Sequence, residues 1–154
     1  MSAPPLPEVA GLLPHSGPML LLDRVLEHSP QGTVCSVAVE ASELFRETDG
    51  SVPTWVGLEY MAQCAAAHGA LAARARGEAL RPGLFLGSRR VRLRADAFGP
   101  HQVLRVSAHH HRGEAGLVAF DCEIRDAAGG ELLADARVNV YTVEAWSDLL
   151  DLPT

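Results

Sequence analysis

The segment from Thr54 to Ala75 places the strongest constraint on how this chain folds. It reads as one long helix, with Thr54 as the expected N-cap after Pro53 and an alanine-rich run continuing it. Apolar residues occupy all its faces, so other elements must cover it on every side. The segment is long enough to cross a bilayer, but Gln63 and His68 interrupt it and alanine is only weakly apolar. We therefore predict a core helix and no membrane span.

Strand-like segments precede and follow this helix. Apolar or alternating residues indicate strands at 19–27, 33–40, 84–95, 102–111, 116–126 and 131–143. Glycine-containing turns separate the last four, which are therefore expected to be antiparallel. A loop is expected at 41–52, and short helices at 8–13 and 144–150. This order predicts an α+β fold in which a curved antiparallel sheet wraps a long central helix, the hot-dog arrangement.

The composition narrows the possible classes of function. A formal net charge of −6 argues against nonspecific nucleic-acid binding. The three cysteines are widely spaced and lack a C-x-x-C pair, so we expect neither a disulfide framework nor structural zinc. That pattern fits a reducing compartment, and no secretory signal is visible, so we expect a cytoplasmic protein. One domain is predicted over residues 7–154, after a flexible proline-rich tail at 1–6.

Glu59 is the only ionised residue between Thr54 and Ala73. A buried carboxylate without a partner costs several kcal/mol, and burial favours its protonated form. A chain keeps such a group when it is paired or used, so Glu59 is a candidate catalytic acid. The alternative is a structural carboxylate paired with Arg24 or another arginine. Gln63 lies one turn later, where it can hydrogen-bond Glu59 and fix its rotamer.

Two segments together resemble the hot-dog 3-hydroxyacyl-ACP dehydratases of type II fatty acid synthesis, where ACP is acyl carrier protein. Residues 13–25 (LPHSGPMLLLDRV) are similar to that family's L-P-H-R-x-P-F-L-L-V-D-R-V segment. Residues 53–63 (PTWVGLEYMAQ) are similar to P-G-V-L-I-I-E-A-M-A-Q at the start of its central helix. Residues 85–91 and 98–100 resemble the next strand and the turn beyond it. The amino-acid sequence of the helix start looks closest to the dehydratase-like subgroup associated with aryl polyene pigment gene clusters.

The resemblance implies an enzyme that removes water from a 3-hydroxyacyl thioester carried by ACP, without a cofactor or metal. It also implies a homodimer, or a heterodimer with another hot-dog protein. In the family, a loop histidine takes a proton and the helix glutamate of the other subunit helps the hydroxyl group leave. Here Phe45 stands where that histidine is expected, and no histidine lies between His28 and His68.

His15 is the remaining candidate for the base, since it lies in a proline-flanked turn of the first motif. The alternative is that His15 only closes that turn through hydrogen bonds. Asp49 is a further candidate, although Asp-Gly usually only forms a turn. His68 is expected to be a satisfied core or interface histidine. His109, His110 and His111 alternate faces on a strand, so we expect no metal site there.

Binding residues are predicted around the helix start and on the following strand. In the family a glycine amide after the helix-start proline polarises the thioester carbonyl. Thr54 replaces that glycine, and a backbone N–H of Thr54 or Trp55 can serve instead. Gln63 and Phe85 are the other predicted substrate contacts.

Seven of the thirteen arginines fall between Arg74 and Arg94. Arg89 and Arg90 are predicted to dock the acidic carrier protein, with a merely solvated strand face as the alternative. Because the loop histidine is missing, a non-catalytic acyl-ACP-binding subunit that pairs with an active dehydratase remains a rival function. An acyl thioesterase is a second rival, from which the two motifs point away.

Overall fold

The computed structural model describes residues 5–79, 83–111 and 116–142. One long helix, α1 (Gly57–Ala75), directly follows the 3-10 turn η4 (Thr54–Val56). The strands of the main sheet are β1 (Arg24–Ser29), β2 (Gly32–Ala38), β4 (Gly83–Leu93), β6 (Val103–His111), β7 (Leu117–Asp126) and β8 (Leu132–Thr142). The remaining described elements are the strands β3 (Val52–Pro53) and β5 (Ala97–Phe98) and the 3-10 turns η1 (Gly17–Met19), η2 (Val39–Ala41) and η3 (Glu43–Phe45).

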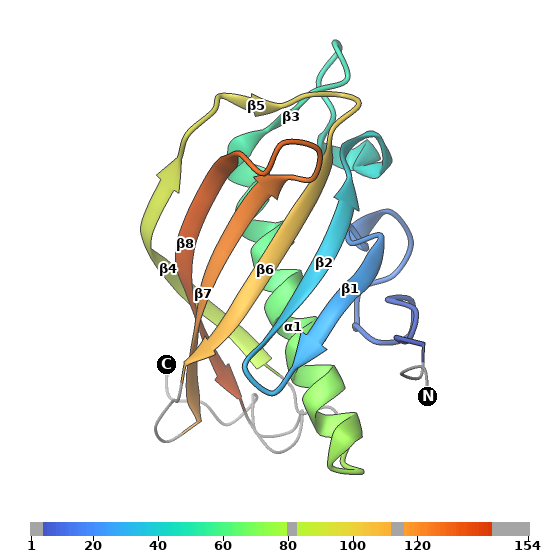
Figure 1. The fold of residues 1–154 in the computed structure, drawn as a ribbon, viewed down its shortest axis with the longest axis vertical. Coiled ribbons are helices and arrows are strands. Elements are labelled where there is room, and N and C mark those ends of the chain that lie inside the picture. Colours follow the sequence, from blue (N-terminus) through green and yellow to red (C-terminus); the bar gives the residue numbers. More distant parts are fainter. Residues whose placement is uncertain (1–4, 80–82, 112–115, 143–154) are drawn as a thin grey trace.

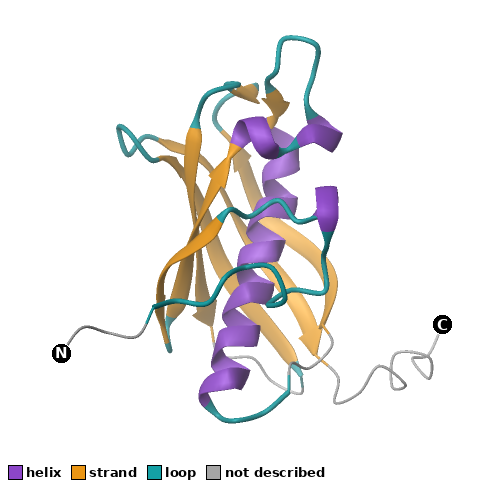
Figure 2. Ribbon diagram, turned by 90° about the vertical axis from the view of Figure 1, so that its right-hand side faces the viewer, coloured by secondary structure: helices purple, strands orange, loops and turns teal. Residues whose placement is uncertain are grey.

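The six long strands form one antiparallel sheet in the order β1-β2-β6-β7-β8-β4. The sheet curves around α1, which lies along its concave face (Figures 1 and 2). β4 follows the helix in sequence and lies at the edge of the sheet, beside β8 (Figure 1). The predicted α+β hot-dog fold, with its long central helix, is confirmed.

The start of α1 packs directly against side chains of the sheet. Val106, Ile124 and Val138 belong to β6, β7 and β8 and are fully buried among the inward-facing side chains. A Cβ atom at Gly57 would lie only 2.8 Å from Ile124 Cδ1. Glycine at this position therefore permits the close approach of helix and sheet. That contact positions the first turn of α1, which carries Glu59 two residues later.

Two predictions about the N-terminal part of the chain are wrong. Residues 8–13 form turns instead of a helix, closed by a bond from the Leu12 N–H to the Val9 carbonyl (3.0 Å). The predicted strand at 19–27 begins only at Arg24, because η1 and an extended run come first. Leu21 and Leu22 in that run are buried against the core, which explains the strand-like apolar pattern. The predicted helix at 144–150 lies outside the described residues.

Thr54 does not cap the helix as predicted. Its hydroxyl group donates to the Ala95 carbonyl (2.8 Å), and no hydrogen bond from its side chain to the helix N-terminus is found. Thr54 therefore joins the helix start to the link between β4 and β5. None of the helices in the described part of the chain combines the length and hydropathy needed to cross a membrane.

Candidate functional site

The segment from Leu13 to Asp23 is fastened to α1 by one glutamine. Gln63 is fully buried, and its Oε1 accepts a hydrogen bond from the Leu21 N–H (3.0 Å). Its Nε2 donates to the Met19 carbonyl (2.8 Å) and to Glu59 Oε1 (2.9 Å). The predicted bond between Gln63 and Glu59 is therefore confirmed. The same side chain joins the two sequence motifs to each other.

This arrangement brings His15 and Glu59 together within one chain. His15 Nε2 lies 3.5 Å from Glu59 Oε1, and both residues line the same cavity. The alternative pairing of Glu59 with Arg24 is wrong, because the Arg24 guanidinium lies beside Asp23 instead (3.5 Å). Two groups at this separation can act on adjacent carbon atoms of one substrate.

The expected burial of Glu59 is wrong for the single chain. Its side chain is 37% exposed, and that of His15 is 28% exposed. The neighbouring helix residues are small, so this face of α1 borders a cavity instead of packing densely against other side chains. Glu59 lies in the first turn of α1, beside this cavity.

The other nitrogen of His15 has an unusual environment. His15 Nδ1 is buried, and no hydrogen-bond partner for it is found within the described residues. A base whose Nδ1 is hydrogen-bonded has its ring orientation fixed and its charged form stabilised. His15 has its Nε2 beside Glu59, but no residue in the described part of the chain bonds its Nδ1.

The cavity beside Glu59 has a volume of about 740 Å³. It extends along one face of α1, from Leu58 at the helix start to Arg76 after its end. Small helix residues form one wall, and side chains of β4, β7 and β8 face them. Phe85 on β4, a predicted substrate contact, lines the cavity and is half exposed. A long apolar cavity with a carboxylate and an imidazole near one end suits an extended acyl chain.

The other predicted substrate contacts lie outside the described lining of this cavity. The Thr54 N–H donates to the Asp96 carbonyl (3.3 Å), so this amide is already engaged. Trp55 is 59% exposed and meets Phe45 edge-on. Its amide lies in the first turn of the helical segment, where backbone N–H groups lack intrahelical acceptors. Gln63 is buried in the core, where it donates a hydrogen bond to Glu59 instead of lining the cavity.

Asp49 is positioned as a turn residue. Its Oδ1 accepts hydrogen bonds from the Ser51 N–H (2.9 Å) and hydroxyl group (2.6 Å). These bonds lower the pKa of the Asp49 carboxyl group. Asp49 is exposed and is not part of the cavity lining. The loop before the helix therefore brings no described acid or base to Glu59.

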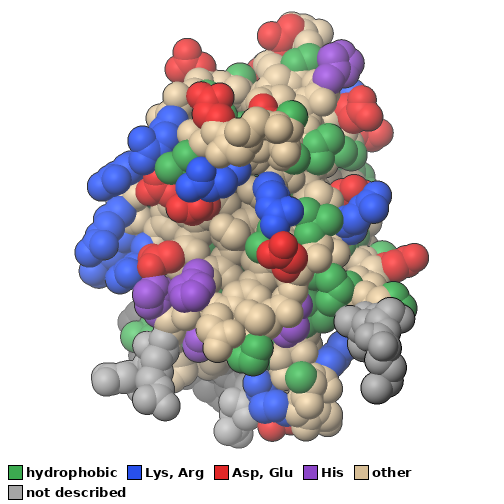
Figure 3. Space-filling model, in the orientation of Figure 1, with side chains coloured by type: hydrophobic (Ala, Val, Ile, Leu, Met, Phe, Trp, Pro, Cys, Tyr) green, Lys and Arg blue, Asp and Glu red, His purple; other side chains and the backbone are tan. Residues whose placement is uncertain are grey.

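The predicted docking arginines lie on the edge strand. Arg89 and Arg90 are exposed on β4, where Arg90 adopts a left-handed backbone conformation (φ 54°) next to an irregularity in the pairing with β8. Basic side chains gather on the side of the molecule formed by β4 (Figure 3, left). Arg94 is partly neutralised, since it bonds Asp135 (3.0 Å).

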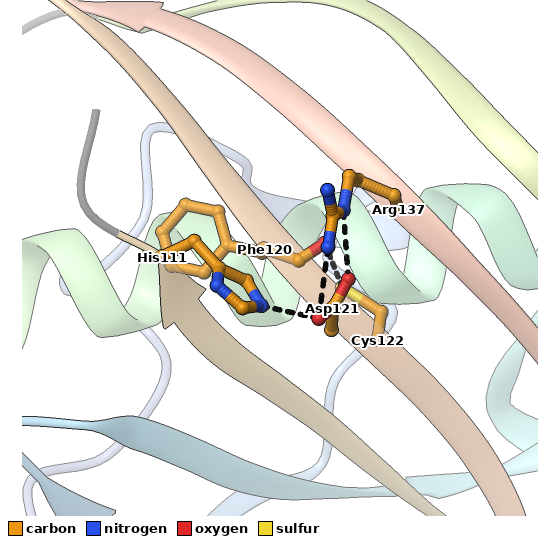
Figure 4. Close-up of polar contacts among 5 residues, drawn as sticks. All are labelled: His111, Phe120, Asp121, Cys122 and Arg137. Atoms are coloured by element: carbon orange, nitrogen blue, oxygen red, sulfur yellow. Dashed lines mark hydrogen bonds and ion pairs between the residues drawn. The ribbon is translucent and has the colours of Figure 1, made fainter. Parts of the chain in front are cut away.

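The run of three histidines divides between two faces, as predicted. His110 points inward and lines the cavity, whereas His111 lies on the outer face of the sheet beside Asp121 (Figure 4). Arg137 also donates to Asp121, at 2.9 Å. These neighbours lower the pKa of the Asp121 carboxyl group, with the Arg137 hydrogen bond as the main cause. The sheet separates this outer cluster from Glu59, which lies beside the cavity on the inner side.

His68 is a buried core histidine, as predicted, with a side-chain partner. It is 4% exposed, and its Nδ1 lies 2.9 Å from Thr33 Oγ1. His28 Nδ1 lies 2.8 Å from the same oxygen atom. No motif in the sequence signals this group, because its members come from β1, β2 and α1 and meet only in the folded chain.

This chain belongs to the ApeP-like family, whose model, described as ApeP dehydratase, matches residues 7–151. A 3-hydroxyacyl-[acyl-carrier-protein] dehydratase, FabZ, from Oleidesulfovibrio alaskensis is 31% identical over 136 residues. The match covers 85% of this chain and 86% of that protein. The resemblance to hot-dog dehydratases, and to their aryl polyene subgroup in particular, is confirmed.

Solved structures support the same assignment. The chain is similar to one in the dehydratase heterocomplex ApeI:P from Xenorhabdus doucetiae, with a TM-score of 0.88 and 29% identity. That match covers 96% of this chain and 97% of the other. A hypothetical thioesterase with coenzyme A from Streptococcus pneumoniae TIGR4 has a TM-score of 0.62 at 12% identity, over 79% of this chain and 85% of the other. This second likeness shows the fold alone.

Proposed function

We propose that this protein removes water from a 3-hydroxyacyl thioester carried by ACP, in a fatty acid or aryl polyene pathway. The observation that carries the proposal is the meeting of His15 and Glu59 at the side of a long apolar cavity. Membership of a dehydratase family and the FabZ relative support the reaction type.

In the proposed reaction, His15 Nε2 takes the proton from the carbon next to the thioester carbonyl. Protonated Glu59 gives its proton to the hydroxyl group on the neighbouring carbon, which leaves as water. The 3.5 Å separation of Nε2 and Oε1 suits these adjacent positions, and it also allows the proton to return from His15 to Glu59 afterwards. The Trp55 amide, at the positive end of the helix, is the proposed donor to the developing enolate oxygen.

We further propose that the protein works with a second hot-dog subunit, either its own copy or a different chain. β4 is a long edge strand with exposed apolar side chains, among them Leu86 (56% exposed) and Leu93 (43%). Such an edge favours pairing with another strand. Pairing at the edge of a strand engages its backbone and leaves the side chains on the two faces of the sheet. Arg89 and Arg90 would therefore stay available to an acidic ACP.

A non-catalytic subunit is the second candidate function, and the environment of His15 favours it. Among the described residues no group bonds the buried Nδ1 of His15, so nothing there fixes the ring in the orientation that a base needs. The similar chain from Xenorhabdus doucetiae belongs to a heterocomplex. In this alternative, Glu59 and the cavity would shape the site of an active partner dehydratase.

One assay separates the two functions. Elimination of water from a 3-hydroxyacyl-ACP is measured with the purified protein alone, for the unmodified chain and the His15→Ala variant. The matched control is His101→Ala, because His101 is an exposed histidine beside Glu40 (4.0 Å), away from the cavity. Turnover that His15→Ala abolishes and His101→Ala preserves supports catalysis by this chain. Turnover only after a partner hot-dog dehydratase is added, unaffected by His15→Ala, supports the subunit function.

A further inference from the structure

The loop at residues 42–51, before the helix start, is tied to α1 by one pair of hydroxyl groups. Tyr60 Oη lies 2.7 Å from Ser42 Oγ, and both side chains are fully buried. Ser42 lies between η2 and η3, and Tyr60 directly follows Glu59 on α1. Burial raises the pKa of the Tyr60 hydroxyl group, so the two groups form a neutral hydrogen bond near pH 7.

The rest of this loop is bonded mainly to itself. The Ser42 N–H donates to the Val39 carbonyl (3.0 Å) and the Phe45 N–H donates to the Ser42 carbonyl (3.0 Å), so Ser42 joins the two 3-10 turns. Residues 47–51 form a turn that is closed by bonds among its own members. Among the hydrogen bonds found in the described part of the chain, the bond from Ser42 to Tyr60 alone joins this loop to α1.

The loop carries an aromatic ring to the start of the helix. Phe45 ends η3 and meets the Trp55 ring edge-on, with the ring centroids 6.3 Å apart. No other aromatic ring is found against Trp55 within the described residues. Trp55 precedes Glu59 by four residues, so the two lie about one helical turn apart on the same side. The position of the loop therefore decides how firmly the turn before Glu59 is packed.

The ring of Tyr60 is held independently of the loop. It lies 5.8 Å from the ring of Phe98, which is fully buried on β5 and pairs with Val52 of β3. Tyr60 is not among the residues that line the cavity. Packing therefore fixes the ring, and the hydroxyl group of Tyr60 is the part that reaches the loop. Its removal would release the loop and leave the ring in place.

We propose that Tyr60 is a positioning residue for the reaction. Through its bond to Ser42 it holds the loop where Phe45 packs on Trp55, and it thereby fixes the direction of the Trp55 amide. The inference rests on the proposed function, in which that amide donates to the enolate oxygen. A donor that is aimed before the substrate arrives stabilises the developing charge without having to reorient during the reaction.

Two variants remove the bond from opposite sides. Tyr60→Phe keeps the ring and loses the hydroxyl group, and Ser42→Ala loses the partner hydroxyl group, so the test does not depend on the folding of one variant. With 3-hydroxyacyl-ACP, and with a partner subunit present if one is required, we expect each to lower kcat about tenfold with KM unchanged. The double variant should be no slower than the slower single variant, because both changes break the same bond.

Tyr141→Phe is the matched control. Tyr141 lies on β8, outside the lining of the cavity, and no hydrogen bond of its hydroxyl group is found among the described residues. This change also removes a tyrosine hydroxyl group, and it should leave kcat unchanged.

Fluorescence reports on the loop independently of turnover. The chain has two tryptophans, so a Trp146→Phe background leaves Trp55 as the single emitter. Loss of either hydroxyl group should increase the quenching of Trp55 by acrylamide, whereas Tyr141→Phe should not. Unchanged quenching, an unchanged kcat, or losses of kcat that multiply in the double variant would each overturn the inference, whatever the effect on stability. Increased quenching in the variants, without any dehydration by the unmodified protein, would instead count against the proposed function alone.

Discussion

The buried amide of Gln63 is the best place to test how the site is held together. Replacing Gln63 by leucine keeps the approximate volume and removes three hydrogen bonds. The Leu21 N–H is buried and loses its acceptor, at a cost of about 1–3 kcal/mol. The Met19 carbonyl is partly buried and adds a smaller amount, so we expect the free energy of unfolding to fall by about 2–4 kcal/mol. Glu59 also loses the donor that fixes its orientation.

The matched control for this change is Gln102→Leu. Gln102 likewise accepts from a backbone N–H, that of Gly99 (2.7 Å), and donates to the carboxylate of Asp126 (3.0 Å). These bonds are partly exposed and lie away from the cavity, so the expected loss is only about 1 kcal/mol. Urea unfolding followed by circular dichroism, at one protein concentration, measures both variants. If Gln63→Leu is no less stable than Gln102→Leu, or if its dehydration rate is unchanged, Gln63 does not hold the site as described.

Two further predictions concern protonation and assembly. Because the pKa of His68 falls from 6.5 to about 4 on folding, the unfolded chain binds more protons between these values, and stability is lost as the pH falls through this window. We expect a loss of about 2 kcal/mol between pH 7 and pH 5 in urea titrations, and a clearly smaller loss for His68→Gln; equal losses would show that another group is responsible. Leu86→Lys, which places a charge on the exposed edge strand, should shift the protein toward monomers in light scattering, whereas Leu44→Lys in η3 serves as the exposed control. An unchanged molar mass for Leu86→Lys would argue against an interface at β4.

The sequence predicts the elements whose patterns reflect local periodicity. The long helix and the four later strands appear within a few residues of their expected positions, because alternation and turn residues report directly on them. The apolar pattern of the segment before β1 wrongly predicts a strand there. Leu21 and Leu22 are buried, but the extended run that contains them forms no regular strand. Its path is set by tertiary bonds to Gln63, which no local pattern records.

The candidate site was predictable only in part for the same reason. Motif resemblance directs attention to His15 and Glu59, and the chain folds so that they meet. Burial of Glu59 was overestimated, because periodicity shows that a helix face is apolar but not whether small side chains leave a cavity beside it. The bridge from His28 through Thr33 to His68 depends on the register of β1 against β2 and on the rotation of α1. Such a group becomes visible only in three dimensions.

The most direct test of the account is the rate of water elimination by Glu59→Gln. Glutamine keeps the size and the hydrogen bonding of the side chain but cannot give a proton to the leaving hydroxyl group. The control is Glu40→Gln, since Glu40 is an exposed carboxylate beside a histidine and outside the cavity. With 3-hydroxyacyl-ACP, and with a partner subunit present if one is required, we expect Glu59→Gln to lower kcat by about 100-fold or more and Glu40→Gln to leave it unchanged. An unchanged kcat for Glu59→Gln in a folded protein would contradict the assignment of Glu59 as the acid.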